Sequence, residues 1–159
     1  MLYVSTRGGA QAVRSTKAVL DGIAPDGGLY MPQTMPTVDW KHILTLPIME
    51  MAVEIFRAFL PDFEDMPGIV SRAYSGKFET EDLTPLVKVG DRYVLELFRG
   101  PTSAFKDVAL SALPQFMVSA RRQEGMTDNV MILTATSGDT GKAALCGFQD
   151  VEGTGIIVS

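Results

Sequence analysis

The chain has 159 residues, of which 46% are hydrophobic and 21% are charged, and its formal net charge is -5. This length is enough for a hydrophobic core. The acidic balance argues against nucleic acid as a partner, because phosphate contacts need clustered Lys and Arg. No apolar run is long enough to cross a bilayer, and there is no secretory signal. The single cysteine, Cys146, excludes an internal disulfide, so we expect a cytoplasmic protein.

The first 85 residues mix short extended and helical segments, and we interpret them as an N-terminal α+β domain. Turn signals and apolar periodicity define the segments. The expected elements are a strand over 1–6, a helix over 15–21, an extended piece over 29–32 and helices over about 47–60 and 67–75. The only histidine, His42, has no other His or Cys nearby, so we expect no metal site.

Residues 86–97 alternate around Gly90-Asp91, which predicts a β-hairpin with a two-residue turn. The hairpin leads into a Gly-Pro turn, a hydroxyl residue placed to cap a helix, and a helix with Lys106 in its first turn. Apolar spacing predicts that one stripe of this helix faces a core. The stripe comprises Phe105, Val108, Ala109, Ala112, Leu113, Phe116, Met117 and Ala120.

Lys106 has two interpretations. It is either a solvated lysine near a helix start, partly neutralised by Asp107, or a lysine held in a cleft that forms a Schiff base with a carbonyl cofactor. The local sequence favours the second interpretation. A polar helix N-terminus beside an aromatic residue suits an anionic, planar ligand such as pyridoxal phosphate, although spacing alone does not identify it.

Residues 130–145 predict a strand, a small polar Gly-rich turn and a helix. The hydroxyls of Thr136, Ser137 and Thr140, together with exposed N–H groups, suit a carboxylate or phosphate. A plain strand-to-helix loop with a Ser or Thr cap explains the same pattern equally well. Residues 156–158 add a strand, so the strand, helix, strand order implies a right-handed parallel crossover.

Four segments resemble the threonine synthase family, in the order and spacing that this family uses. They are Tyr3 to Gly9, Ala24 to Pro32, Glu96 to Leu110 and Leu133 to Ala144. The resemblance implies an α/β, fold-type II pyridoxal phosphate enzyme that converts O-phospho-L-homoserine and water to L-threonine and phosphate. It also implies that residues 86–159 begin the doubly wound, parallel-sheet domain that binds the cofactor.

The resemblance assigns roles to individual residues. Lys106 would be the Schiff-base lysine and general base, with Phe105 beside the cofactor ring. Asp139 would lie near the 3'-oxygen of the cofactor. The residues expected to hold the substrate carboxylate are Thr136, Ser137 and Thr140. Asp139 also favours threonine synthase over cysteine synthase relatives, which often carry Asn there.

The chain departs from the family pattern at three positions around the expected cleft. His is common at the position of Arg99, Leu at that of Ser103, and a small or neutral residue at that of Lys142. Each departure alters the charge or shape expected of the cleft. None of them removes the lysine.

We expect the chain to be the N-terminal part of a larger enzyme, because only about two parallel strands are present. The resemblance places the Gly-rich phosphate loop further along, so the isolated segment is expected to be inactive. Two alternatives remain open: a threonine-synthase-like phospholyase acting on another phosphorylated amine, or a non-catalytic, truncated unit for folding or partner binding. The oligomeric state is not predicted.

Two other motif assignments are weaker. Residues 103–106 fit the S-x-x-K pattern of serine enzymes, but the chain has no Lys-Thr-Gly element and only Ser137-Gly138-Asp139 in place of Ser-Asp-Asn. A nucleotide-binding loop at residues 136–143 fails because Thr136 replaces its first Gly and Ala143 its last Ser or Thr.

Overall fold

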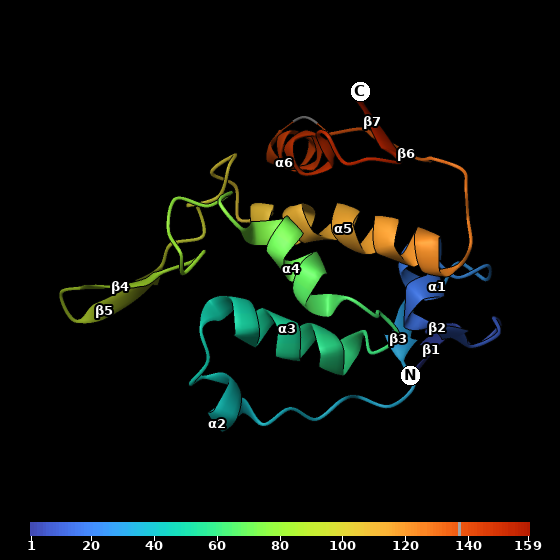
Figure 1. Ribbon diagram of the computed structural model, residues 1–159, viewed down its shortest axis with the longest axis horizontal. Coiled ribbons are helices and arrows are strands. Elements are labelled where there is room, and N and C mark those ends of the chain that lie inside the picture. The colour runs from blue at the N-terminus through green and yellow to red at the C-terminus, as the bar shows by residue number, and fades with distance from the viewer. Residues whose placement is uncertain (137) are drawn as a thin grey trace. The chain divides into compact units, whose positions relative to one another are not determined.

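The computed structural model describes residues 1–136 and 138–159, which form two compact units (Figure 1). Unit 1 comprises residues 1–69 and 116–127, and unit 2 comprises residues 70–115 and 128–159. Two helices, α4 and α5, contribute residues to both units. Each unit is therefore described by the elements and contacts within it.

The elements agree closely with the segments expected from the sequence. Unit 1 holds β1 (Leu2–Ser5), β2 (Val13–Arg14), α1 (Ser15–Asp21), β3 (Tyr30–Pro32), α2 (Trp40–Ile43), α3 (Ile48–Phe59), the start of α4 (Met66–Tyr74) and the end of α5 (Asp107–Gln123). Unit 2 holds the rest of α4 and α5, with β4 (Leu86–Val89), β5 (Arg92–Leu95), β6 (Val130–Thr134), α6 (Asp139–Phe148) and β7 (Thr154–Val158).

The sheet of unit 1 has the order β2-β1-β3, with both neighbours antiparallel to β1. Its core is aromatic. The ring of Phe116 meets those of Phe56 and Phe63 edge to face, at centroid distances of 4.9 and 5.1 Å. Edge-to-face pairs add stabilisation beyond that of buried apolar area. The Phe116 ring thus anchors the end of α5 within unit 1.

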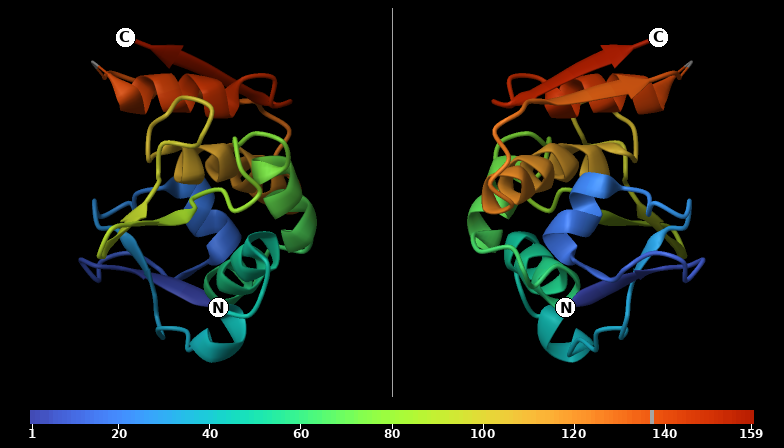
Figure 2. Two further views of the ribbon diagram at one scale, coloured as in Figure 1. Left: turned by 90° about the vertical axis from the view of Figure 1, so that its left-hand side faces the viewer. Right: turned by 90° about the vertical axis from the view of Figure 1, so that its right-hand side faces the viewer.

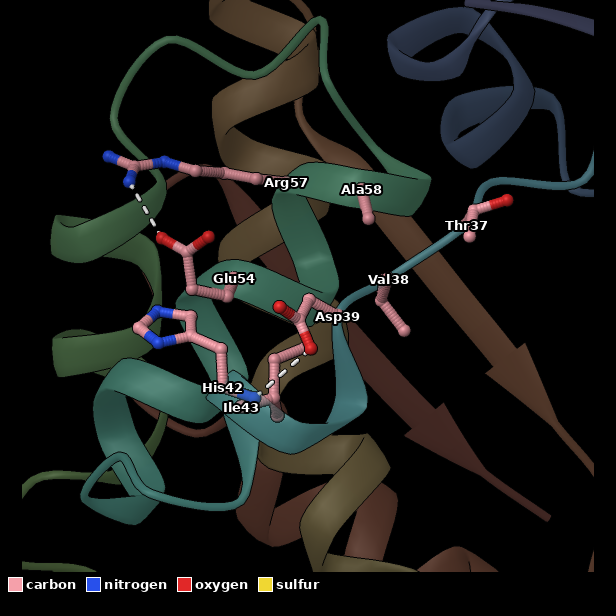
Figure 3. A pocket seen from close by; sticks show the side chains of 8 residues that line it. All are labelled: Thr37, Val38, Asp39, His42, Ile43, Glu54, Arg57 and Ala58. Carbon is pink, nitrogen blue, oxygen red and sulfur yellow. Dashed lines mark hydrogen bonds and ion pairs between the residues drawn. The ribbon is translucent and has the colours of Figure 1, made fainter.

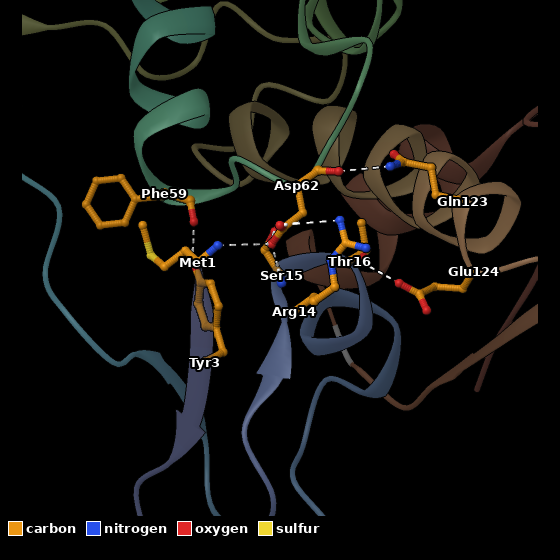
Figure 4. Close-up of polar contacts among 9 residues, drawn as sticks. All are labelled: Met1, Tyr3, Arg14, Ser15, Thr16, Phe59, Asp62, Gln123 and Glu124. Atoms are coloured by element: carbon orange, nitrogen blue, oxygen red, sulfur yellow. Dashed lines mark hydrogen bonds and ion pairs between the residues drawn. The ribbon is translucent and has the colours of Figure 1, made fainter.

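A polar cluster around Asp62 fastens the start of α1 in unit 1 (Figure 4). The Asp62 carboxylate accepts hydrogen bonds from the Ser15 N–H at 3.0 Å and the Ser15 hydroxyl at 2.7 Å. Arg14 and the Met1 amine lie 3.4 and 3.6 Å from it. The Gln123 amide donates to the Asp62 carbonyl at 2.8 Å. The Asp62 carboxylate therefore caps the N-terminus of α1, although it is distant from this helix in the sequence.

Replacing Asp62 with Asn is expected to lower the free energy of unfolding by about 1–3 kcal/mol at pH 7. Burial opposes ionisation, but the Ser15 hydrogen bonds and the nearby positive charges lower the pKa of Asp62 overall. The stabilisation is thus complete above the unfolded pKa, about 4, and is lost as the pH falls through the lower folded pKa. In urea unfolding, the free energy of unfolding of the wild type should exceed that of Asp62→Asn at pH 7, and this difference should shrink below pH about 4.

The control for this experiment is Asp91→Asn, because the Asp91 side chain is 95% exposed in the hairpin turn of unit 2. We expect it to change the free energy of unfolding by less than about 0.5 kcal/mol. If the difference in free energy of unfolding between the wild type and Asp62→Asn stayed constant from pH 7 down to pH 2, the ionised Asp62 carboxylate would not be its source.

In unit 2, β6 and β7 pair in parallel, and α6 connects them and lies alongside them (Figure 2). The parallel crossover expected from the sequence is thus confirmed.

Gly147 allows α6 to pack closely on α5, since a Cβ there would lie 2.1 Å from the Leu110 carbonyl oxygen. The Tyr74 hydroxyl donates to the Val108 carbonyl at 3.0 Å, which joins α4 to the same helix. Burial raises the pKa of Tyr74 to about 12.

The predicted hairpin is also confirmed: β4 and β5 are antiparallel, and Gly90 in the turn has φ +64°. The Glu96 N–H donates to the Pro85 carbonyl at 2.9 Å, which closes the base of the hairpin. All strand residues of this pair are exposed.

The prediction for the lysine helix needs two corrections. Helix α5 begins at Asp107, so Lys106 precedes the helix and does not lie in its first turn. Phe105 is outside the helix and 61% exposed, Leu113 is 38% exposed and Ala109 is also exposed, so none of the three belongs to the buried stripe. The buried members of the predicted stripe are Ala112, Phe116, Met117 and Ala120. The apolar periodicity predicts a helix that begins too early, because the polar contacts between Thr102 and Asp107 shape the segment before Asp107 into a turn.

No helix among the described residues is long and apolar enough to span a membrane. Nor do these residues contain a group of three His, Cys, Asp or Glu side chains placed to hold a metal ion.

Candidate active site

The turn that carries Lys106 is built around the buried carboxylate of Asp107, which is 1% exposed. Thr102 donates its N–H to one carboxylate oxygen at 2.8 Å and its hydroxyl to the other at 2.6 Å. Hydrogen bonds to a charged group are stronger than neutral ones, especially away from water. Gly100 completes the turn, because a Cβ there would lie 2.5 Å from the Asp107 side chain. The position of Lys106 is therefore fixed by its sequence neighbour.

Ser103 does not form a catalytic pair with the lysine. Its backbone lies in the left-handed region, at φ +59°, and its N–H donates to the Gly100 carbonyl at 3.1 Å. Among the described residues, no hydrogen bond joins the Ser103 hydroxyl to Lys106. Nucleophilic serine chemistry needs a base within hydrogen-bond reach. The S-x-x-K alternative thus gains no support.

The Lys106 side chain is half-buried, and its Nζ lies 4.3 Å from the centroid of the Phe105 ring. No Asp or Glu in the described part of the chain forms an ion pair with this amine. Its backbone is fixed, since the Leu110 N–H donates to the Lys106 carbonyl at 2.8 Å. The amine is thus partly shielded from water, adjacent to an exposed aromatic face and available for chemistry.

The second part of the site is the start of α6. Gly138 precedes the helix and offers no side-chain cap, while the N–H groups of Gly141 and Lys142 bond to the Gly138 carbonyl. The N–H groups of Asp139 and Thr140 have no acceptor among the described residues. Uncapped N–H groups at a helix N-terminus attract anions. This end of α6 is therefore suited to a carboxylate.

The structure describes three of the four predicted loop residues. Thr136 and Thr140 are half-buried and Asp139 is exposed, whereas Ser137 lies outside the described residues. Thr136 follows β6, and its N–H donates to the Ser159 carbonyl at 3.2 Å. A Cβ on Gly141 would lie 2.5 Å from the Thr136 methyl group, so this glycine lets the loop fold back onto the helix.

One hydrogen bond connects the lysine turn to α6. Lys142 Nζ donates to the Thr102 carbonyl oxygen at 3.2 Å. A cavity of about 490 Å³ lies where these segments meet. Its lining residues are Pro101, Thr102, Lys142, Leu145, Cys146, Gln149 and Ile156. Cys146 is half-buried and free.

Arg99 is held by two carboxylates that the sequence pattern did not identify. Its guanidinium lies 2.8 Å from Glu79 and 2.8 Å from Glu96, and 5.1 Å from the Phe98 ring centroid. The hydrogen bonds that Arg99 donates to Glu79 and Glu96 raise the pKa of Arg99. The charge of this departure from the family pattern is thus compensated locally. Arg99 anchors the segment that precedes the lysine turn.

A second cavity, of about 360 Å³, lies in unit 1 beside the only histidine (Figure 3). Asp39 caps the short helix α2 by accepting the N–H groups of Lys41 and His42, both at 3.2 Å. Arg57 lies 3.4 Å from Glu54, and both side chains are exposed. These contacts account for the charged groups of the cavity, so the lysine turn remains the stronger candidate.

Comparison with known proteins shows similarity along almost the whole chain. A family model described as "Threonine synthase N terminus" matches residues 2–74. Threonine synthase of Pseudomonas aeruginosa is 38% identical over 165 residues, which cover 99% of this chain and 34% of that protein. Threonine synthase of Saccharomyces cerevisiae is 33% identical over 177 residues, with the same two coverages. The chain therefore spans about a third of the length of these curated relatives.

Solved structures of threonine synthases are also similar to almost the whole chain. A PLP-bound threonine synthase from Brucella melitensis matches with a TM-score of 0.89 and 39% identity, covering 99% of this chain and 35% of that one. Threonine synthase from yeast matches with a TM-score of 0.86 and 34% identity, with the same coverages. These neighbours confirm the fold class expected from the sequence. The roles of the individual site residues stay predictions.

Proposed function

We propose that the chain belongs to the threonine synthase family, whose N-terminal third it matches, and that it carries the lysine and carboxylate-binding parts of such an enzyme. The proposed reaction converts O-phospho-L-homoserine and water to L-threonine and phosphate. The observation that supports it best is the half-buried Lys106 amine, which has no acidic partner among the described residues and is held in a turn locked by Asp107.

The residues of the turn fit pyridoxal phosphate as the cofactor. An aldehyde needs an amine that is not tied to a carboxylate, and Lys106 supplies one among the described residues. A planar ring needs an apolar face, and Phe105 offers an exposed ring next to that amine. We propose that Lys106 holds the carbonyl carbon, that Phe105 lies beside the ring, and that Asp139 lies near the 3'-oxygen.

Pyridoxal phosphate, when bound, supplies a reactive carbonyl and a conjugated ring that withdraws electrons from the substrate carbons. The part of Lys106 is then that of a base. Its Nζ would remove protons from the substrate carbons as an uncharged amine and return them as an ammonium. The locked turn keeps Nζ in one place between these transfers, which lowers the entropic cost of reaching the reactive geometry.

The start of α6 would bind the other end of the substrate. We propose that the hydroxyls of Thr136, Ser137 and Thr140, together with the uncapped N–H groups, hold the substrate carboxylate. The helix dipole favours a negative charge at this place. Because α6 is joined to the lysine turn through Lys142 and Thr102, the bound carboxylate and the Lys106 amine would be held at a defined separation.

We also propose that activity requires the remaining two thirds of the enzyme, so the 159 residues alone are inactive. The division into domains 1–85 and 86–159 stays a prediction about that whole enzyme, since the compact units reflect contacts within this chain. As a class, the enzyme would be a carbon–oxygen lyase acting on phosphates. The acidic composition supports a small-molecule substrate without a nucleic acid partner, and the single cysteine supports a cytoplasmic location.

Product analysis tests the proposal. The full-length protein, supplied with pyridoxal phosphate and O-phospho-L-homoserine, should release threonine and phosphate in equal amounts. Release of phosphate with 2-oxobutyrate and no threonine would assign the phospholyase alternative instead. Absence of both products from a protein that binds the cofactor would contradict either activity.

A further inference from the structure

Lys142 occupies an unfavourable position for a lysine. It lies in the first turn of α6, where the helix dipole supplies partial positive charge and disfavours cations. Its ammonium is directed to the Thr102 carbonyl, at 3.2 Å, a residue 40 positions earlier in the chain. A charge-assisted hydrogen bond of this kind offsets the unfavourable position. The position of the lysine thus has an energetic cost, and the contact with Thr102 offsets it. We therefore ask what else the contact does.

Thr102 is also the residue that locks the lysine turn. Its carbonyl accepts from Lys142, while its N–H and hydroxyl both donate to Asp107. Thr102 is 7% exposed and Asp107 is 1% exposed, so water competes little for the two bonds between them, whereas Lys142 is exposed and its bond to the Thr102 carbonyl is only partly buried. Asp107 directly follows Lys106 in the sequence. A continuous path of bonds therefore runs from the start of α6 to the proposed Schiff-base lysine.

The two ends of this path differ in how firmly they are held. The lysine turn keeps its two Thr102–Asp107 bonds when Lys142 is removed. The start of α6 has no side-chain cap to replace the lost contact. Loss of the Lys142 contact would therefore loosen the first turn of α6, while packing at Gly141 and Gly147 holds the rest of the helix, and it would leave Lys106 in place.

We propose that Lys142 is a positioning residue that sets the carboxylate loop at the correct separation from the Lys106 amine. This inference rests on the proposed function. It assigns Lys142 to substrate binding and not to cofactor attachment, because its contact holds the first turn of α6, where Thr140 lies, and does not touch the amine. The substrate affinity and the cofactor affinity should therefore respond differently to its loss.

The test uses Lys142→Met in the full-length protein, because methionine keeps an unbranched stem and removes the charge. Lys142→Arg is the conservative variant, since a guanidinium can donate to the same carbonyl. Lys88→Met is the matched control, because Lys88 lies on the exposed hairpin of the same unit. Two quantities are measured: labelling of Lys106 by pyridoxal phosphate and borohydride, and the dissociation constant for O-phospho-L-homoserine from the change in cofactor absorbance.

We expect Lys142→Met to raise the substrate dissociation constant about 5- to 10-fold, as for the loss of one hydrogen bond. Labelling of Lys106 should match that of the wild type, Lys142→Arg should recover most of the affinity, and Lys88→Met should change neither quantity. An unchanged substrate affinity in Lys142→Met, or a parallel loss of labelling, would overturn the inference alone. A wild-type protein without label on Lys106 would overturn the proposed function and the inference with it.

Discussion

Replacing Lys106 with alanine is expected to lower the rate of threonine formation by about 10³-fold or more. The change removes the amine that would hold the cofactor and move protons, and no other lysine is fixed in the turn between Gly100 and Asp107. Cofactor absorbance after gel filtration and the rate of threonine formation measure the two losses separately.

The control for this experiment is Lys88→Ala, an exposed lysine of the hairpin, which should keep both the absorbance and the rate. Alanine at position 106 should also leave the free energy of unfolding within about 1 kcal/mol of the wild type, because a half-buried lysine contributes little to stability. A Lys106→Ala protein that retained even a tenth of the wild-type rate would contradict the role proposed for this residue.

Replacing Asp107 with asparagine is expected to lower the free energy of unfolding by about 2–4 kcal/mol. Thr102 presents two donors to this side chain, at 2.8 and 2.6 Å. Asparagine has one acceptor oxygen, so its NH₂ group would face a donor in a buried site. The turn would open, and labelling of Lys106 should fall as well. Urea unfolding at pH 7 measures the first effect and borohydride labelling measures the second.

Asp91→Asn serves again as the control, because the same chemical change at an exposed site should cost less than about 0.5 kcal/mol. A stable Asp107→Asn protein with undiminished labelling would show that the Thr102 contacts do not hold the lysine turn. A destabilised protein with normal labelling would separate stability from positioning and contradict the second half of the prediction.

Much of the fold follows from local signals in the sequence. The hairpin is predictable because alternating residues flank Gly90-Asp91, and Gly90 does adopt the positive φ that such a turn requires. The β6-α6-β7 crossover is predictable from two apolar runs that flank a helical pattern. Helix α1 also begins and ends where expected, but its start is fastened by Asp62, 47 residues away, and not by a local cap.

The site was predictable as a set of segments but not as a geometry. Motifs predict Lys106 and the start of α6 as parts of the site, yet they indicate Asp107 only as a charge that neutralises the lysine. The partner of Asp107 in the structure is Thr102. Periodicity does not predict this pair, because it does not show in which direction a buried side chain points. The Lys142 contact joins residues 40 positions apart, so no local pattern contains it. The same holds for Arg99, which binds Glu79 from a distant segment.

The most direct test of the account locates the lysine that binds the cofactor. The full-length protein is incubated with pyridoxal phosphate and reduced with borohydride, and the modified peptide is identified by mass spectrometry. We expect one equivalent of label, confined to Lys106 and lost in Lys106→Ala. Label spread over several lysines, or confined to a different one, would show that the Asp107 turn does not present the cofactor-binding amine.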